Sequence, residues 1–343
     1  MSTRHGHGLV PGRFCPPHAG HHHLVRTALG RCARVTVLVT GAADDPLPLA
    51  ERVAWLREIH PEALVVGAAA EDGPDGLQAA VETAVREPVD AVFTSAPHGA
   101  GLARRLGAAS VLVDPERRTH PVTSAAVRAD PAGHWELLAA PVRAALARRV
   151  VVLGAESSGA TTLAHALADH YRRRGGVWTR TRCVPDQGSA YAARRLAELR
   201  ADRPGAGPAD VLLRSADFPV LAQDQAEREE EAARAGSPLL VCDTDAFAAT
   251  IRHERLLGTA SPDTCAVAAR GRHHLWLLTD HRGVGPGDDG DDGLRAWTTA
   301  RLLAQLTHSG RRTVVVTGPH EERLATAVAA VDALLAEPLL ERR

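Results

Sequence analysis

The sequence predicts an α/β protein made of two doubly wound, parallel-sheet domains. Short β-rich apolar runs alternate with amphipathic helical stretches along the whole chain, the pattern of parallel strands joined by crossover helices. Two strand-to-helix turns, at residues 12–21 and 154–162, carry glycines and polar side chains suited to anions. A length of 343 residues is typical of two domains rather than one.

The expected elements alternate in both halves of the chain. In the first half we expect strands at residues 8–11, 34–40, 63–67, 89–94 and 110–113, and helices at 19–30, 49–59 and 77–86. In the second half we expect strands at 150–153, 177–184, 238–242, 275–278 and 313–317, and helices at 162–174, 189–198, 220–235, 246–257, 294–309 and 321–335. The Gly- and Asp-rich stretch 283–293 is expected to be a loop, either over a site or simply on the surface. Each half holds a complete alternating set, so we expect domains at residues 1–147 and 148–343.

Composition excludes several classes of protein. With 40 basic and 41 acidic side chains the net charge is −1, so the chain has no basic field to attract nucleic acid. No apolar run reaches membrane-spanning length and no signal peptide is evident, so we expect a cytoplasmic protein without membrane insertion. The 5 cysteines are widely spaced, odd in number and expected to be reduced thiols. The sequence leaves open whether the chain forms a homo-oligomer.

The chain contains no lysine, so every basic side chain other than histidine is arginine. Alanine, arginine and glycine dominate, while aromatic residues are only 3% of the chain. This composition is typical of a genome biased against lysine codons, as in high-GC bacteria. The absence of lysine at any single position therefore carries less functional weight than usual.

A glycine-rich loop opens the second half of the chain. Its glycines and the threonine after them have P-loop spacing between a strand-like run and a helix, where backbone N–H groups bind phosphate. The residues expected to bind the phosphates of a nucleotide are Gly154, Ser157, Ser158, Gly159, Thr161 and Thr162. Position 160, where the pattern requires lysine, is Ala160. Either the match is accidental, or this is a P-loop that has lost its phosphate-pairing cation.

The first half has an anion-binding turn of its own, His18-Ala19-Gly20-His21. Two histidines three residues apart at the start of a helix can point at the same anion, which is the arrangement needed to hold a triphosphate. The alternative is a surface histidine cluster or weak metal site at residues 21–23. The full string, which adds Gly12, Arg13 and Phe14, resembles the signature of the nucleotidyltransferase superfamily, whose H-x-G-H motif binds ATP.

A second segment supports the same resemblance. Thr123 and Arg128 match a late motif of that superfamily, in which a helix opens with its arginine facing the ATP phosphates. The alternative is an N-capped surface helix with an exposed arginine. At this distance after the H-x-G-H motif, the phosphate role is favoured.

The order of the two motifs resembles the bacterial NadR-type family, which fuses a nicotinamide-mononucleotide adenylyltransferase to a ribosylnicotinamide kinase. The resemblance covers essentially the whole chain. It implies a Rossmann-like nucleotidyltransferase followed by a P-loop kinase, with ATP as substrate, Mg²⁺ as cofactor, and nicotinamide mononucleotide, ribosylnicotinamide and NAD as the other ligands. It implies catalytic roles for His18, His21 and Arg128. It also implies that Arg52 and Trp55 hold the nicotinamide nucleotide, although ordinary packing would equally explain Trp55.

In the second domain the resemblance implies that Thr161 and Asp243 bind Mg²⁺, with Asp243 also catalytic. Asp245 would bind the substrate ribose or act as a base. Asp186 would contact substrate, but the family's Pro-Glu-Tyr-Gly-Arg reads Pro-Asp-Gln-Gly-Ser here, so its arginine is lost at Ser189. Together with Ala160, this predicts retained ATP binding and a weak or substrate-altered kinase. The alternative is a non-catalytic or half-active sensor of nicotinamide nucleotides.

Overall fold

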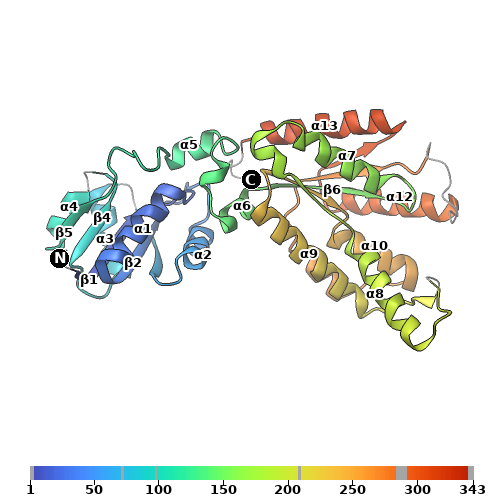
Figure 1. Ribbon diagram of the computed structural model, residues 1–343, viewed down its shortest axis with the longest axis horizontal. Coiled ribbons are helices and arrows are strands. Elements are labelled where there is room, and N and C mark those ends of the chain that lie inside the picture. Colours follow the sequence, from blue (N-terminus) through green and yellow to red (C-terminus); the bar gives the residue numbers. More distant parts are fainter. Residues whose placement is uncertain (1–3, 71–72, 97–98, 208–209, 283–291, 339–343) are drawn as a thin grey trace. The chain divides into compact units, whose positions relative to one another are not determined.

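The computed structural model describes residues 4–70, 73–96, 99–207, 210–282 and 292–338. Most of the stretch 283–293 lies outside these residues, so its expected loop stays a prediction. The chain separates into two compact units, one of residues up to Ala145 and one of Leu146–Glu337 (Figure 1). None of the described helices is long and apolar enough to cross a membrane.

The first unit is a parallel five-stranded sheet in the order β3-β2-β1-β4-β5. Its strands are β1 (His5–Gly12), β2 (Cys32–Gly41), β3 (Leu64–Ala69), β4 (Ala91–Thr94) and β5 (Ala109–Leu112). Its helices are α1 (Ala19–Arg31), α2 (Leu49–Ile59), α3 (Pro74–Ala84), α4 (Gly99–Arg105), α5 (Ser124–Ala129) and α6 (Ala140–Leu146), with a 3-10 turn η1 (Trp135–Leu137).

Both faces of this sheet are covered. Leu9 and Val10 are neighbours in β1, both 0% exposed, and they belong to hydrophobic cores on opposite faces. One core takes in α1 and α2 through residues such as Val25 and Leu56, and the other takes in α3 and α4 through Val81 and Leu102. Burial on both faces explains why the strands read as nearly continuous apolar runs, and it confirms the predicted doubly wound fold.

The second unit repeats this architecture in the strand order β10-β9-β6-β8-β7, again all parallel. Its strands are β6 (Arg148–Gly154), β7 (Arg182–Val184), β8 (Leu239–Asp243), β9 (Leu275–Thr279) and β10 (Thr313–Val316). Its helices are α7 (Ala160–Arg172), α8 (Gln187–Asp202), α9 (Asp217–Ala235), α10 (Ala246–Leu257), α11 (Pro262–Ala268), α12 (Asp292–His308) and α13 (His320–Ala336), with a 3-10 turn η2 (Gly176–Arg180). Helices α8 and α9 pack together beside the sheet (Figure 1).

The strand expected at residues 177–184 is wrong over most of its length. A 3-10 turn follows Gly175 and Gly176, both with positive φ, and only the last three residues pair as β7. The hydroxyls of Thr179 and Thr181 donate to the carbonyls of Gly176 and Trp178, at 2.8 and 2.7 Å. Such local bonds compete with strand pairing, which overrides the β propensity of this stretch. The short helices α4, α6 and α11, of 7 residues each, are too brief to show a helical period in the sequence.

Candidate functional site

Both units place a strand-to-helix turn at the C-terminal end of a central strand. In the first unit β1 lies between β2 and β4, where the chain order of the strands reverses, and α1 begins shortly after β1. In the second unit β6 lies between β9 and β8 and is followed by the glycine-rich loop and α7. Open α/β sheets bind ligands at such positions, outside the carboxyl ends of the strands.

The two histidines of the first turn lie against each other. His18 occupies the N-cap position of α1 and His21 its first turn, with the two rings stacked at a centroid distance of 3.8 Å. The ring of Phe14, 1% exposed, meets His21 edge-on at 4.8 Å. The Nδ1 atoms of both histidines are buried, and they lack a hydrogen-bond partner within the described part of the chain.

These histidines are neutral at pH 7 in the free protein. Burial, then the positive charge of Arg117, lowers the pKa of His18 to about 4. Burial also lowers the pKa of His21 well below its ordinary value, with the neighbouring His18 adding to the effect. A neutral imidazole ring donates one N–H and accepts at its other nitrogen. An arriving anion would favour the charged forms again.

A cavity of about 210 Å³ lies beside the two histidines. Gly20 and Thr123 line it as the sequence predicts, and Thr123 also caps α5 by accepting the N–H of Ala126 at 3.0 Å. Arg117 lines the same cavity and is a cation that sequence reasoning missed, although it lies in the loop just before Thr123. The pocket thus combines neutral histidines with one guanidinium.

Arg128 contacts the turn that precedes α1. Its guanidinium donates to the carbonyl of Cys15 at 2.6 Å, and Arg128 is not among the residues that line the cavity. Ser124 makes a parallel bond to the carbonyl of Pro16 at 3.0 Å. Helix α5 therefore anchors the turn that precedes α1, while the phosphate-facing role expected for Arg128 stays a prediction.

Arg52 and Trp55 are both buried, and their expected substrate-binding roles stay predictions. The guanidinium of Arg52, 0% exposed, donates to the carbonyls of Arg13 and Thr40 at 2.5 and 2.9 Å and to Asp45 at 2.7 Å. Arg52 therefore joins the C-terminal ends of β1 and β2. Trp55 is 7% exposed and lines neither cavity of the first unit.

A second cavity of the first unit, of about 660 Å³, lies at the ends of β1, β2 and β4. Gly12 and Arg13 line it, and Arg13 forms an ion pair with Asp45. These two residues, expected to contact ATP, therefore border a larger and separate hollow from the one beside the histidines.

The glycine-rich loop of the second unit forms the wall of a cavity of about 470 Å³. All six residues expected to bind phosphate line it: Gly154, Ser157, Ser158, Gly159, Thr161 and Thr162. Gly159 has a φ of +84°, a left-handed conformation that glycine adopts without strain, and it starts α7. The first N–H groups of a helix have no partner within the helix, so they are suited to an anion here.

Two buried arginines hold this loop by its carbonyl groups. Arg323 donates to the carbonyls of Ser158 and Gly318, each at 2.7 Å, and to two more at 3.0 Å. Arg295 donates to the carbonyls of His281 at 3.0 Å and Ser157 at 3.4 Å. Sequence reasoning gave neither arginine a role, because their partners are backbone groups far along the chain.

Three predicted acidic residues line the same cavity. Asp243 ends β8 and is 6% exposed, and burial raises its pKa although a hydrogen bond from Thr161 opposes the rise. Asp186 caps α8, accepting the N–H of Gly188 at 2.8 Å, and remains partly exposed. Thr161 and Asp243 therefore sit together beside the loop, with the hydroxyl and carboxylate oxygens that Mg²⁺ prefers.

Asp245 lines the cavity but both of its oxygens are engaged. One accepts the N–H of Ala248 at 2.9 Å, capping α10, and the other accepts the indole N–H of Trp276 at 2.9 Å. Each carboxylate oxygen can accept a second hydrogen bond, so the ribose-binding or base role expected for Asp245 stays a prediction. Thr244 beside it has a φ of +102°, a strained conformation for a residue with a side chain.

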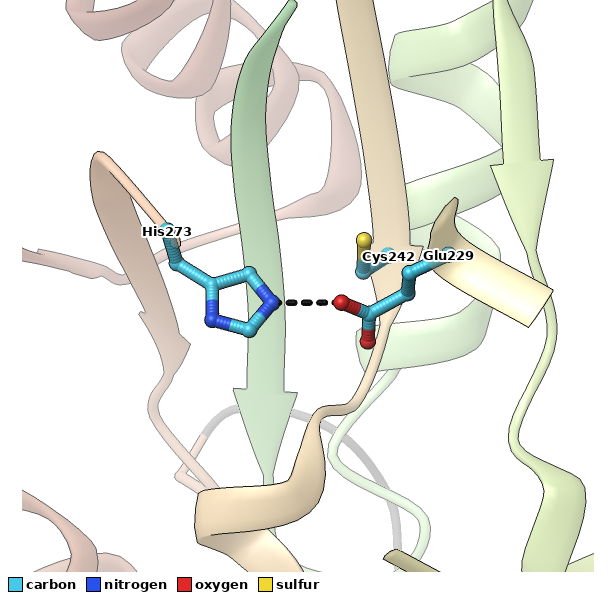
Figure 2. Close-up of side chains that lie close together, drawn as sticks. All are labelled: Glu229, Cys242 and His273. Atoms are coloured by element: carbon cyan, nitrogen blue, oxygen red, sulfur yellow. Dashed lines mark hydrogen bonds and ion pairs between the residues drawn. The ribbon is translucent and has the colours of Figure 1, made fainter. Parts of the chain in front are cut away.

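A buried histidine, His273, lies close to Asp245. The Nε2–H of His273 donates to Glu229 at 2.6 Å (Figure 2). Its Nδ1 lies 3.8 Å from Asp245. Burial opposes the imidazolium, but the bond to Glu229 and the charge of Asp245 raise the pKa of His273 overall. Gln225 donates to Glu229 at 3.1 Å. The ring thus lies between two carboxylates, which favour its protonated form.

The thiol of Cys242 lies near this pair (Figure 2), and the potential ligand atoms of the three residues lie within 4.8 Å of one another. A metal ion would need a thiolate, whereas burial raises the pKa of Cys242 well above its ordinary value. A proton already joins His273 to Glu229. The cluster is therefore accounted for as a buried ion pair beside a neutral thiol.

Comparison with known proteins finds relatives of the second unit and of the whole chain. A family model described as "AAA domain" matches residues 149–323. The trifunctional NAD biosynthesis/regulator protein NadR of Escherichia coli is 23% identical over 300 residues, covering 80% of this chain and 68% of that protein. A nicotinamide-nucleotide adenylyltransferase of Aeropyrum pernix is 46% identical over 54 residues, covering 14% of this chain and 31% of that protein.

Solved structures share the fold of the whole chain. A crystal structure of NadR protein in complex with NR has a TM-score of 0.72 at 18% identity, covering 99% of this chain and 98% of that one. A second, in complex with NAD and AMP-PNP, has a TM-score of 0.71 at 18% identity, covering 99% of each chain.

We predict that Arg52→Met lowers the free energy of unfolding of the first unit by about 3 kcal/mol, because it leaves Asp45 and two carbonyls without a buried donor. Urea unfolding measures this change. Arg26→Met, at an exposed position on α1, is the matched control and should stay within about 0.5 kcal/mol of the unaltered protein. A weaker nucleotide affinity with unchanged stability would instead favour a substrate-binding role for Arg52.

We also predict that the second unit loses stability as pH rises. A raised pKa in the folded state means that the His273–Glu229 pair contributes fully below the ordinary pKa of 6.5 and fades as pH passes the raised value. Between the ordinary and the raised pKa, the free energy of unfolding falls with a slope that approaches about 1.4 kcal/mol per pH unit. Urea midpoints between pH 6 and 9 should fall less for His273→Gln than for the unaltered chain or for His308→Gln, an exposed control. Parallel curves for all three proteins would contradict the assignment.

Proposed function

Because the chain belongs to the AAA domain family through residues 149–323 and is a NadR-type protein, we propose that it synthesises NAD in two ATP-dependent steps. The second unit phosphorylates the 5′-hydroxyl of ribosylnicotinamide. The first unit joins the resulting nicotinamide mononucleotide to AMP from a second ATP. Relatives support both steps, since one is an NAD biosynthesis protein and another a nicotinamide-nucleotide adenylyltransferase.

The observation that carries this proposal is the presence of one phosphate-binding turn in each unit. One turn presents stacked neutral histidines and the other a helix start behind a glycine-rich loop, and each borders its own cavity. Two turns of different chemistry suit two different cleavages of ATP. The ligands are then small molecules throughout, and the 5 free cysteines suit the cytoplasmic location that we propose.

In the second unit the 5′-hydroxyl oxygen of ribosylnicotinamide forms a bond to the γ-phosphorus of ATP, and the bond to the β-phosphate oxygen breaks to leave ADP. The helix start at Thr161 and Thr162 binds the phosphates. Asp186, whose carboxylate is partly exposed in the cavity, accepts the proton of the attacking hydroxyl. Thr161 and Asp243 would hold Mg²⁺, which supplies charge neutralisation for the phosphates.

In the first unit a phosphate oxygen of nicotinamide mononucleotide forms a bond to the α-phosphorus of ATP, and the bond to the β-phosphate breaks to leave pyrophosphate. His18, His21 and Arg117 surround one cavity and stabilise the charge that develops on the leaving pyrophosphate. The larger cavity beside Gly12 and Arg13 accommodates the nicotinamide nucleotide. Reaction between two bound substrates needs positioning rather than a covalent intermediate.

One observation favours a second candidate for the second unit. Ala160 leaves the glycine-rich loop without its own cation, and loss of one charged phosphate contact typically costs about 10²–10³ in rate. A unit that binds ATP and ribosylnicotinamide without turnover would act as a sensor of nicotinamide nucleotides. The assay below separates the two candidates.

We predict that the two activities can be removed independently. His21→Ala should abolish NAD formation from nicotinamide mononucleotide and ATP while leaving phosphorylation of ribosylnicotinamide intact, and Asp243→Asn should do the reverse. Chromatographic separation of the products measures both reactions, and each variant is the control for the other. Binding of both ligands without phosphorylation in the unaltered protein would favour the sensor. No NAD formation would reject the transferase.

We predict that pyrophosphate binding to the first unit takes up protons. The free pKa of His18 is about 4, and a bound anion raises it, so uptake is expected near pH 5.5. Calorimetry in buffers of different ionisation enthalpy measures the number of protons. The His18→Asn/His21→Asn double variant corrects for protons taken up by the ligand itself. An equal uptake by that variant would show that the histidines do not titrate.

A further inference from the structure

The cavity beside the glycine-rich loop contains two cations that do not come from the loop. Among the described residues that line it, the positively charged ones are Arg252 and Arg255, both on α10. They lie three residues apart, so they project from the same side of the helix. Position 160, where such loops carry their cation, offers only a methyl group.

Arg255 reaches the loop itself. Its guanidinium forms an ion pair with Glu156, which lies between Gly154 and Gly159, and its side chain is 13% exposed. This pair lowers the pKa of Glu156, although burial of the carboxylate opposes the shift. The Nε atom of Arg255 is buried without a hydrogen-bond partner. A permanently charged group is therefore held at the phosphate loop by an acid of that loop.

Arg252 lies one turn earlier, between the loop and the start of α8. Its Nη1 is 3.9 Å from Asp186, and it lies where a Cβ on Gly188 would come within 2.5 Å. A larger residue at position 188 would require this guanidinium, the far end of a flexible side chain, to move. The charge of Arg252 also acts on Glu156. Arg252 thus lies within reach of the charges of Asp186 and Glu156, two acidic residues that line the cavity.

The other arginines near the loop cannot supply this charge. Arg323 and Arg295 hold carbonyl groups of the loop and of neighbouring segments, and both are nearly fully buried. Moving either guanidinium to a ligand would break several buried hydrogen bonds at once. Arg252 and Arg255 of α10 instead face the carboxylates of Asp186 and Glu156. A bound phosphate can take the place of each carboxylate.

We propose that Arg252 and Arg255 together bind the phosphates of the nucleotide in place of the missing loop lysine, and that Glu156 holds Arg255 until the phosphates displace it. The identity of the nucleotide as ATP rests on the function proposed above. A planar guanidinium suits phosphate because it can donate two parallel hydrogen bonds. Its length requires it to come from a neighbouring helix rather than from the tight loop.

Hydrogen–deuterium exchange of the loop peptide, residues 154–162, tests this at one site of the intact chain. Titration with ATP should protect the peptide with an apparent Kd that rises about 10- to 100-fold in Arg255→Gln and in Arg252→Gln, the range of a charge-assisted hydrogen bond. Adenosine, which lacks phosphates, should bind these variants as it binds the unaltered chain. Glu156→Gln should act in the opposite direction and lower the apparent Kd for ATP.

Two further variants test whether a change in Kd comes from the lost charge or from a disturbed structure. Ala160→Lys in the Arg255→Gln background should restore ATP affinity, because it returns a cation to the loop. Arg195→Gln removes an arginine of the exposed pair with Glu198 and should change the Kd less than twofold. The proposal is overturned if both α10 variants keep the unaltered Kd while folded, or if ATP does not protect the loop.

The outcome is separable from the function proposed above. If ATP protects the loop through Arg252 and Arg255 but ribosylnicotinamide is not phosphorylated, the arginine assignment holds and the kinase assignment falls. If phosphorylation occurs with an unchanged KM for ATP in both variants, the kinase assignment holds and the arginine assignment falls.

Discussion

The absence of lysine is the constraint on which much of this structure depends, because every permanent positive charge must be a guanidinium. A guanidinium offers five donors in one plane, whereas an ammonium offers three on a flexible stem. The chain uses this fork to join backbone segments. Arg323 donates to four carbonyls around the glycine-rich loop, and Arg52 donates to two carbonyls and Asp45 at the ends of β1 and β2. Buried arginines thus hold the glycine-rich loop beside the cavity of the second unit, and the ends of β1 and β2 beside the larger cavity of the first unit.

Arginine's role in holding the backbone explains why its place in a motif is a poor guide to its function. Arg128 occupies the motif position of a phosphate ligand, yet its guanidinium meets the carbonyl of Cys15. Arg117, at no motif position, lines the cavity beside the histidines. Every residue provides a backbone carbonyl, so the sequence does not show whether an arginine will bind a carbonyl or a ligand. Only the tertiary structure decides between these two partners.

The sequence predicts well what contiguous residues determine. The apolar strands and the two turns follow from local patterns, and the doubly wound sheets follow from their alternation. It predicts poorly what distant residues determine. Asp245 accepts the indole N–H of Trp276, 31 residues away, a contact that no local pattern predicts. The strand expected at residues 177–184 fails because the hydroxyls of Thr179 and Thr181 bond their own backbone. In each case a polar partner, rather than an apolar pattern, decides the structure.

The two units handle phosphate charge in opposite ways. In the first, burial and Arg117 lower the pKa of His18 to about 4, so the rings are neutral until an anion makes protonation favourable. In the second, the charge on α10 is permanent and is balanced by Glu156 when no ligand is bound. We propose that the first site couples anion binding to proton uptake, and that the second couples it to the exchange of one ion pair for another. Neither arrangement leaves an unbalanced buried charge in the free protein, which would cost more stability than a small domain can lose.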